Sequence, residues 1–389
     1  MTHNLSAKSG KVTANESRAQ VVNVAVAVIH YQQHYLLGYR NASQHQGDRY
    51  EFVGGKIDTN ETAQAALIRE VSEEVAIDIS GNSALKLGRL HHDYGDKQVC
   101  LQVFKVALSA AQYQQHKDDE FGPEGQALVW VDKSDLLANK YKLPAANTTI
   151  LAWLRLPKLI TITYPLAHFA TQLDSCEAWL RFHQQNIANN AWVYVRLKDK
   201  QASHFAALIL QSRSDIMAIL PVESSRGINS SDTSETIIKK TTTDVSIRSE
   251  DLNYESLRPQ LAAYHLNHAE VLTWFHNLRV NYDDNKRLYI EQPLILSCHD
   301  VQSIQAANAI AKMRLQQHLP PVIGIFLSPV LATHTHPDDN PLGWRQWSTL
   351  AQLADIPVIA LGGLYPNMYD LASTYGAVSI AGIRQFLHD

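Results

Sequence analysis

The stretch GGKIDTNETAQAALIREVSEEVAI, residues 54–77, brings three glutamates, Glu70, Glu73 and Glu74, within five consecutive positions. On a helix, carboxylates three and four residues apart lie on one face and repel each other. One interpretation of such a cluster is a solvated, charged helix face. The other is a divalent cation site, because Mg²⁺ prefers oxygen ligands and would remove the repulsion that the spacing creates.

The same stretch predicts an amphipathic helix that begins after Thr62, its N-cap, and runs to about Val75. Each helical residue advances by about 100° around the axis. Leu67, Ile68 and Val71 therefore share one arc with Val75, and we expect this arc to pack on a sheet. The glutamates fall on the neighbouring arc, so the packing face and the acidic face are separate.

The residues around the glutamates resemble the Nudix box, the signature of the Nudix hydrolases. That signature is Gly, five residues, Glu, seven residues, and then Arg-Glu-aliphatic-x-Glu-Glu-x-Gly-aliphatic. Eight of its nine specified positions agree here, and they are Gly55, Glu61, Arg69, Glu70, Val71, Glu73, Glu74 and Ile77. The resemblance implies a Nudix fold and hydrolysis of a P–O–P bond in a nucleoside-diphosphate-like compound.

The resemblance also implies roles for individual residues. Glu70, Glu73 and Glu74 would bind Mg²⁺, with Mn²⁺ as an alternative, while Arg69 orients them through a salt bridge and Glu61 supports the geometry of the loop and helix. The bound metal would neutralise phosphate charge and activate the attacking water. The implied catalytic residues and metal ligands are together Gly54, Arg69, Glu70, Glu73, Glu74 and Glu124, the last as an outer ligand or general base.

Ala76 departs from the box, which has Gly at this position. That Gly ends the helix, commonly with a positive φ. An alanine that keeps this conformation costs roughly 1 kcal/mol. Because the ligands lie upstream, we expect a small loss of stability and no loss of metal.

A longer similarity, from Val21 to about Leu156, links the chain to the 8-oxo-dGTP diphosphatases of the MutT type. The segment YEFVGGKI is similar to their Glu-Phe-Pro-Gly-Gly-Lys segment, with Val53 in place of the proline. EGQALVWV and LPAANTTIL are similar to their Glu-Gly-Gln and Pro-Ala-Asn segments. The substrate-binding residues that this similarity implies are Arg40, Phe52, Tyr94, Lys97 and Asn147.

Each of these residues has an implied role and a plainer alternative. Asn147 would hydrogen-bond the oxidised purine, or could be only a helix N-cap. Phe52 would pack near the base, or could be ordinary core, and Arg40 would lie close to the nucleotide. Tyr94 and Lys97 would occupy a strand facing the nucleotide, or could be ordinary strand surface.

Beyond the first half, eight apolar strand-like runs alternate with helical segments. The runs are 159–165, 192–198, 216–221, 262–267, 293–300, 321–330, 356–364 and 378–383. Continuous hydrophobicity suits strands buried on both faces, and eight such units in about 230 residues match the size of a (β/α)₈ TIM barrel. An open flavodoxin-like sheet would give a similar pattern. The fold class expected for the chain is therefore α/β, with an N-terminal Nudix α/β/α sandwich and a C-terminal barrel.

This second half resembles thiamine-phosphate synthase through SPVLATHTH (328–336) and IPVIALGGL (356–364). Several of that family's active-site positions are replaced: its Asn-Asp pair is missing from PVESS (221–225), His336 replaces a lysine and Arg384 a serine. A phosphate site could still be formed by Lys198, Lys200, Gly362, Gly363 and Arg384. Synthase activity, binding of a phosphate ligand without catalysis, and a structural role all stay open.

The expected organisation is a disordered tail at 1–20, a Nudix domain at 21–156 and a barrel at 157–389, with a Ser/Thr-rich mobile insertion at 223–255. The net charge of −4 gives no basic surplus for a polymeric nucleic acid. Three scattered cysteines and the lack of a signal peptide or membrane-length apolar run indicate a cytoplasmic protein without membrane contact. The oligomeric state stays open.

Three functions are compatible with the sequence. The leading one is Mg²⁺-dependent conversion of 8-oxo-dGTP into 8-oxo-dGMP and pyrophosphate, which cleanses the nucleotide pool of a mutagenic precursor. The second keeps the Nudix chemistry but acts on a thiamine-related pyrophosphate. The third is a ligand-sensing or scaffolding protein with a degenerate barrel, against which the intact glutamates argue.

Overall fold

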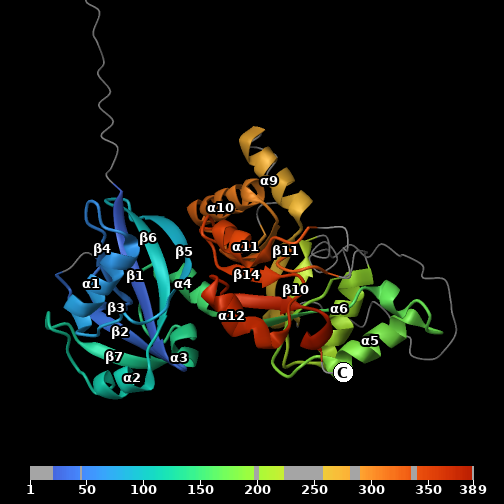
Figure 1. Ribbon diagram of the computed structural model, residues 1–389, viewed down its shortest axis with the longest axis horizontal. Helices are drawn as coiled ribbons and strands as arrows, with labels where there is room; N and C mark the ends of the chain where they lie inside the picture. The colour runs from blue at the N-terminus through green and yellow to red at the C-terminus, as the bar shows by residue number, and fades with distance from the viewer. Residues whose placement is uncertain are drawn as a thin grey trace, which may run out of the picture.

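The computed structural model describes residues 21–43, 46–196, 201–222, 257–280, 290–333 and 340–387. Within them the chain forms an N-terminal sheet with helices and a C-terminal closed barrel, which lie side by side (Figure 1). The predicted tail at 1–20, the predicted insertion at 223–255, Lys198, Lys200 and His336 lie outside the described residues.

The N-terminal half is built on a mixed seven-stranded sheet. Its strands are β1 (Val22–Tyr31), β2 (His34–Arg40), β3 (Arg49–Glu51), β4 (Val53–Lys56), β5 (Ala84–Asp93), β6 (Gln98–Ala107) and β7 (Leu128–Asp132). The main order is β3-β2-β1-β6-β5, while β4 pairs with β1 and β7 pairs with β2. The β1–β6 pair is parallel and the other pairs are antiparallel.

Helices cover both faces of this sheet. They are α1 (Ala63–Val75), α2 (Ala110–His116), α3 (Lys133–Leu137) and α4 (Asn147–Leu154). Ala25 and Ala27 of β1 share an apolar cluster with α1, whereas Val26 and Val28 share another with α4. Because neighbouring residues of β1 face opposite helices, the buried run 25–29 in the middle of the strand is apolar at every position. The α/β/α sandwich is confirmed.

The C-terminal half is a closed barrel of eight parallel strands, ordered β10-β11-β12-β13-β14-β15-β8-β9. The strands are β8 (Leu159–Ile162), β9 (Trp192–Tyr194), β10 (Met217–Pro221), β11 (Leu261–Leu266), β12 (Leu294–Cys298), β13 (Val322–Leu327), β14 (Val358–Leu361) and β15 (Ser379–Gly382). Each predicted apolar run contains all or most of one strand. Closure of the barrel by pairing of β15 with β8 excludes the open-sheet alternative.

Helices surround the barrel on the outside. The α-helices are α5 (Ser175–Asn186), α6 (Gln201–Ser212), α9 (His268–Val280), α10 (Val301–Gln316), α11 (Gly343–Ala351) and α12 (Tyr369–Thr374). The 3₁₀ turns are η1 (Leu166–Phe169), η4 (Arg258–Gln260), η6 (Pro366–Met368) and η7 (Arg384–Phe386). No helix in the described ranges is long and apolar enough to cross a membrane.

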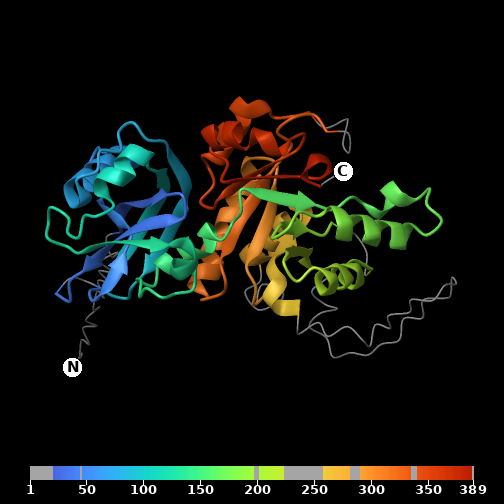
Figure 2. The same ribbon diagram turned by 90° about the horizontal axis from the view of Figure 1, so that it is seen from below.

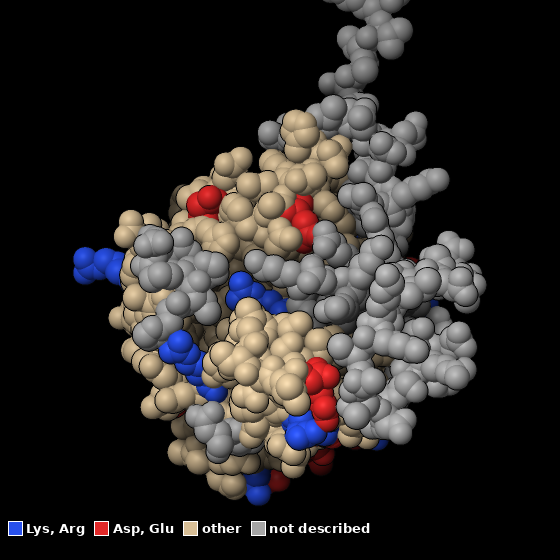
Figure 3. All heavy atoms as spheres, turned by 90° about the vertical axis from the view of Figure 1, so that its right-hand side faces the viewer, with Lys and Arg blue, Asp and Glu red and all other residues tan. Residues whose placement is uncertain are grey.

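The two halves meet through α4, which leads directly into β8 (Figure 2). Apolar side chains of α4 share one cluster with residues of the barrel strands, among them Ile323 and Phe326 of β13. On the barrel face turned away from this junction, the described basic and acidic side chains are scattered over a mostly uncharged surface (Figure 3). The sheet half therefore docks on one end of the barrel.

Candidate active site

The acidic cluster lies on α1, whose bounds agree with the predicted helix. The Thr62 hydroxyl accepts a hydrogen bond from the Ala65 amide at 3.1 Å and caps the helix. Leu67, Val71 and Val75 are buried against the sheet, while Ile68 at the edge of this face is partly buried. Packing thus fixes which side of α1 the glutamates occupy.

The two glycines before α1 lie at close approaches. A Cβ on Gly54, which has a φ of +149°, would lie 2.1 Å from the Ala25 carbonyl oxygen of β1. A Cβ on Gly55 would lie 2.1 Å from the Glu70 carboxylate. The first glycine therefore lets β4 pair with β1, and the second leaves room for a carboxylate of the acidic cluster.

The Arg69 guanidinium connects the acidic residues of this region. It donates to both Glu61 oxygens at 3.1 and 2.9 Å, to Glu70 at 2.8 Å, to Glu73 at 3.1 Å and to the Lys56 carbonyl at 3.0 Å. The hydrogen bond from Arg69 lowers the pKa of Glu61. These contacts hold Glu70 and Glu73 on one side of the helix.

Glu74, like Glu70, is a partly buried member of the cluster. Its carboxylate accepts a hydrogen bond from the Gly54 amide at 3.1 Å. Burial, followed by the negative charges of Glu51, Glu70 and Glu124, raises the pKa of Glu74 to about 8 against the effect of that bond. A carboxyl surrounded by other acids in this way favours the arrival of a positive charge.

The donor set at this site fits a hard divalent cation. In the described part of the chain, no three carboxylate, imidazole or thiol groups already lie close enough together to hold a metal ion. The carboxylates of α1 are nevertheless oxygen donors on one helix side, and a cation would relieve the raised pKa of Glu74. The oxygen donors of the site therefore suit a hard divalent cation.

Two residues near the cluster were missed by the sequence analysis. Glu51 accepts from the Arg40 guanidinium at 2.8 and 2.6 Å, and its charge contributes to the raised pKa of Glu74. The Gln126 amide donates to the Glu74 carbonyl oxygen at 2.6 Å. Both lie in segments that resemble MutT enzymes, and this resemblance is the sequence feature that could have identified them. The loop holding Gln126 also contains Glu124, whose side chain is exposed.

Asn147 and Phe52 lie on the sheet face opposite α1. The Asn147 side chain is 6% exposed, and the ring of Phe52 is 3% exposed within the apolar cluster that includes α4. The alternative that Asn147 is the N-cap of α4 is wrong, because Ala146 caps the helix with a helical φ of −58° and ψ of −30°. The Asn147 backbone N–H donates to the Pro144 carbonyl at 2.9 Å, whereas its side-chain amide bonds none of the described residues and keeps its donor and acceptor.

The prediction that Tyr94 and Lys97 occupy a strand is also wrong. They lie in the turn between β5 and β6, where the Tyr94 amide donates to the Lys97 carbonyl at 2.9 Å. Gly95, with a φ of +91°, allows this turn, and the Asp93 carboxylate accepts from its amide at 2.8 Å. A backbone hydrogen bond with Ala146 places the Tyr94 hydroxyl beside Asn147, while Lys97 is partly buried in the same turn.

The barrel residues proposed for a phosphate site are only partly described. Gly362 and Gly363 follow β14, and Arg384 follows the adjacent β15 with an exposed side chain. A Cβ on Gly362 would lie 2.8 Å from the Pro329 Cα, and one on Gly363 would lie 2.7 Å from the Ala332 carbonyl oxygen. Close packing of the loop after β13 therefore already requires both glycines.

A polar row inside the barrel was not predicted. The Tyr194 hydroxyl lies 2.8 Å from His265 Nδ1, and His265 Nε2 lies 2.8 Å from the Ser297 hydroxyl. Burial lowers the pKa of His265 to about 3, so its imidazole is neutral. These three residues lie in strands β9, β11 and β12. The sequence did not identify them because each is a polar residue within an apolar run.

Two family models match different parts of the chain. Residues 24–153 match the NUDIX domain, and residues 291–386 match thiamine monophosphate synthase. An 8-oxo-dGTP diphosphatase of Haemophilus influenzae is 31% identical over 134 residues, which are 34% of this chain and 90% of the relative. The chain therefore belongs to the Nudix family, and its N-terminal half is that of a Nudix hydrolase.

Further relatives agree with this assignment and differ in the substrate that they are named for. An 8-oxo-dGTP diphosphatase of Proteus vulgaris is 37% identical over 71 residues, which are 18% of this chain and span 62% of the relative's length. A CTP pyrophosphohydrolase of Escherichia coli is 28% identical over 138 residues, or 34% of this chain and 90% of the relative.

The barrel half has its own similarity. It is 38% identical over 63 residues to "Putative thiamine-phosphate synthase 2" of Aquifex aeolicus, and these residues are 16% of this chain and 34% of that protein. The particular protein is thus a Nudix hydrolase joined to a domain that resembles thiamine-phosphate synthase.

Proposed function

We propose that the N-terminal half hydrolyses 8-oxo-dGTP to 8-oxo-dGMP and pyrophosphate in a Mg²⁺-dependent reaction, with Mn²⁺ as an alternative cation. The observation that carries this proposal is the position of Asn147 at the start of α4, next to the Ala146 backbone that bonds the Tyr94 hydroxyl, with no side-chain hydrogen bond to a described residue. A side-chain amide without a protein partner keeps both its donor and its acceptor for a ligand. Such a hydrolase would remove a mutagenic precursor before DNA replication uses it.

The phosphate end of the substrate would lie at the acidic cluster. Glu70, Glu73 and Glu74 would hold the cation, with Gly54 and Glu124 as further ligands, and the cation would neutralise phosphate charge and activate water. Arg69 would keep Glu70 and Glu73 in place through its hydrogen bonds.

The base end of the substrate would lie on the opposite sheet face. The amide of Asn147 offers both a donor and an acceptor to the altered edge of an 8-oxo-purine. Phe52 would form an apolar wall, Tyr94 and Lys97 would border the site from their turn, and Arg40 would lie near the nucleotide. A site built on hydrogen bonds discriminates between substrates more sharply than an apolar one does.

Substitution of Asn147 by Ala tests this assignment. We expect kcat/KM for 8-oxo-dGTP to fall by roughly 10- to 100-fold, the value of one or two buried hydrogen bonds, while kcat/KM for dGTP changes by less than about threefold. Thr148→Ala is the matched control, because Thr148 is the exposed neighbour on the same helix. An equal loss for both nucleotides, or a wild-type preference for thiamine diphosphate, would contradict the proposal.

A further inference from the structure

The barrel holds α4 from the side opposite the sheet. Six of the eight residues of α4 are buried, which is more than one face of a helix. The Trp153 indole N–H donates to the Val322 carbonyl oxygen at 3.1 Å in a buried hydrogen bond. Val322 is the first residue of β13, so α4 is bound to the end of the barrel where the strands begin.

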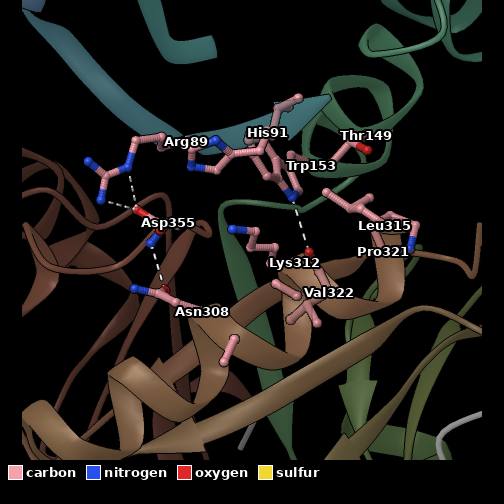
Figure 4. A pocket seen from close by; sticks show the side chains of 13 residues that line it. Arg89, His91, Thr149, Trp153, Asn308, Lys312, Leu315, Pro321, Val322 and Asp355 are labelled. Atoms are coloured by element: carbon pink, nitrogen blue, oxygen red, sulfur yellow. Dashed lines mark hydrogen bonds and ion pairs between the residues drawn. The ribbon is translucent and has the colours of Figure 1, made fainter. Parts of the chain in front are cut away.

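Strand β5 is held to the same end of the barrel (Figure 4). The Arg89 amide donates to the Asp355 carbonyl at 3.1 Å, and the Arg89 guanidinium lies 2.8 Å from the Asp355 carboxylate. A Cβ on Gly88 would lie 2.7 Å from the Asp355 carbonyl oxygen, so the glycine permits this approach. The Asn308 amide oxygen accepts from the Asp355 N–H at 2.8 Å and fixes the loop that Arg89 contacts.

The two elements fixed by the barrel are those that carry the proposed base-recognition residues. Asn147 begins α4, about 9 Å along the helix axis from Trp153. Tyr94 follows the end of β5, and its hydroxyl is bonded to the backbone of Ala146. The acidic cluster, in contrast, lies on α1, which packs on the other face of the sheet.

We infer that the barrel is a structural part of the nucleotide site, in which Trp153 and Asp355 are positioning residues that set where Asn147 and Tyr94 meet the base. This inference rests on the proposed function, because it assigns the barrel a role in base recognition. It predicts that weakening the junction affects substrate binding and selectivity and spares the metal-dependent step on α1.

A cavity beside Trp153 gives the side chain room to move. Its volume is about 220 Å³, and Thr149, Trp153, Lys312 and Asp355 are among the residues that line it (Figure 4). Because this cavity lies beside Trp153, packing does not enclose the side chain on every side. The hydrogen bond to the Val322 carbonyl therefore helps to hold it in place. A shift there is transmitted to Asn147, since both residues belong to one short helix.

The test compares Trp153→Phe with Trp130→Phe in the full chain. Trp130 is a matched control, because its indole donates to the His116 carbonyl at 3.2 Å within the sheet half. For Trp153→Phe we expect the KM for 8-oxo-dGTP to rise by about three- to tenfold, because a displaced Asn147 weakens about one hydrogen bond to the base, with kcat changed by less than about twofold. The preference over dGTP falls by the same factor, and Trp130→Phe changes neither quantity.

Asp355→Ala provides a second variant in case the first does not fold, and the same rise in KM is expected. Unchanged KM and selectivity in both variants, or a loss of kcat alone through a smaller active fraction, would overturn the inference. Failure of the proposed function is seen separately, in a wild type that does not prefer 8-oxo-dGTP. In that case the KM of both variants is measured for CTP or dGTP, whichever the wild type hydrolyses faster. An unchanged KM then overturns the inference.

Discussion

Lys105 shows how one residue can carry an electrostatic cost. It lies on β6 and is partly buried, and burial, followed by the charges of Lys133 and Lys158, lowers its pKa to about 8. In the unfolded chain the ammonium titrates near 10.5. Below about pH 8 the folded protein must hold a charge that its surroundings disfavour, so Lys105 lowers stability at neutral pH.

Lys105→Met should therefore stabilise the protein at pH 7. Between about pH 8 and 10.5 the unfolded state binds the proton that the folded state has lost, so the wild type gains stability as the pH rises. The stability difference between variant and wild type should shrink across that window. Urea denaturation at pH 7, 8.5 and 10 measures it, with the exposed Lys142→Met as control. A variant less stable than the wild type at pH 7 would contradict this account.

The glycines of the acidic stretch are also explained at the residue scale. Gly55 lets the Glu70 carboxylate lie against the backbone, because a Cβ there would displace that carboxylate. A motif match identifies this glycine, and only coordinates show which atom excludes the side chain. The same holds for Glu51, whose contribution to the pKa of Glu74 depends on a contact across the fold.

At the scale of elements, helix α1 ends in a strained residue. Ala76 keeps the left-handed conformation, with a φ of 55° and ψ of 23°, and its amide donates to the Ser72 carbonyl at 3.1 Å. The left-handed conformation is therefore kept with alanine in place of the usual glycine, which is the condition under which we expect a small loss of stability. The helix end is maintained at a cost of roughly 1 kcal/mol.

Ala76→Gly should remove this cost and stabilise the protein by about 1 kcal/mol, measured as the free energy of unfolding in urea. Ala65→Gly is the control in the first turn of the same helix, where the φ is helical and glycine should destabilise the protein. Hydrolytic activity at saturating Mg²⁺ should not change in Ala76→Gly. A loss of stability in this variant would mean that the strain lies elsewhere.

Elements with a strong local pattern could be predicted from the sequence. Helix α1 follows from its cap, its apolar arc and its acidic arc, and the barrel strands follow from apolar runs that are buried on both faces. The turn at Tyr94 and Lys97 could not be placed, because the register of β5 and β6 decides where the strands end. The alternative that Asn147 caps α4 could not be excluded from the sequence, because Ala146, without a capping side chain, gives no local signal.

At the scale of the whole molecule, the two halves pack against each other, but their candidate sites do not share an opening. The sheet half contacts the barrel where β13 begins, at Val322, whereas Gly362 and Gly363 follow the opposite end of β14. The sheet half, with its candidate active site, therefore lies at one end of the barrel, and the candidate phosphate site of the barrel lies at the other end. Contacts such as Arg89 with Asp355 join residues 266 positions apart, which no local pattern reveals.

This arrangement explains why a barrel with replaced active-site positions could still be needed. Its strand ends supply the surface on which α4 and β5 rest, and that surface does not depend on synthase chemistry. The thiamine-related alternative finds no support in this geometry, since the mouth of the barrel is turned away from α4.

The most direct measurement is kcat/KM of the purified full chain with Mg²⁺ for 8-oxo-dGTP, dGTP, CTP and thiamine diphosphate, with Glu74→Gln alongside. We expect a preference for 8-oxo-dGTP over dGTP of at least about 100-fold, because the proposed site recognises the base through hydrogen bonds. We also expect release of pyrophosphate and loss of the activity in Glu74→Gln. Hydrolysis confined to CTP or thiamine diphosphate, or an unaffected Glu74→Gln variant, would contradict it.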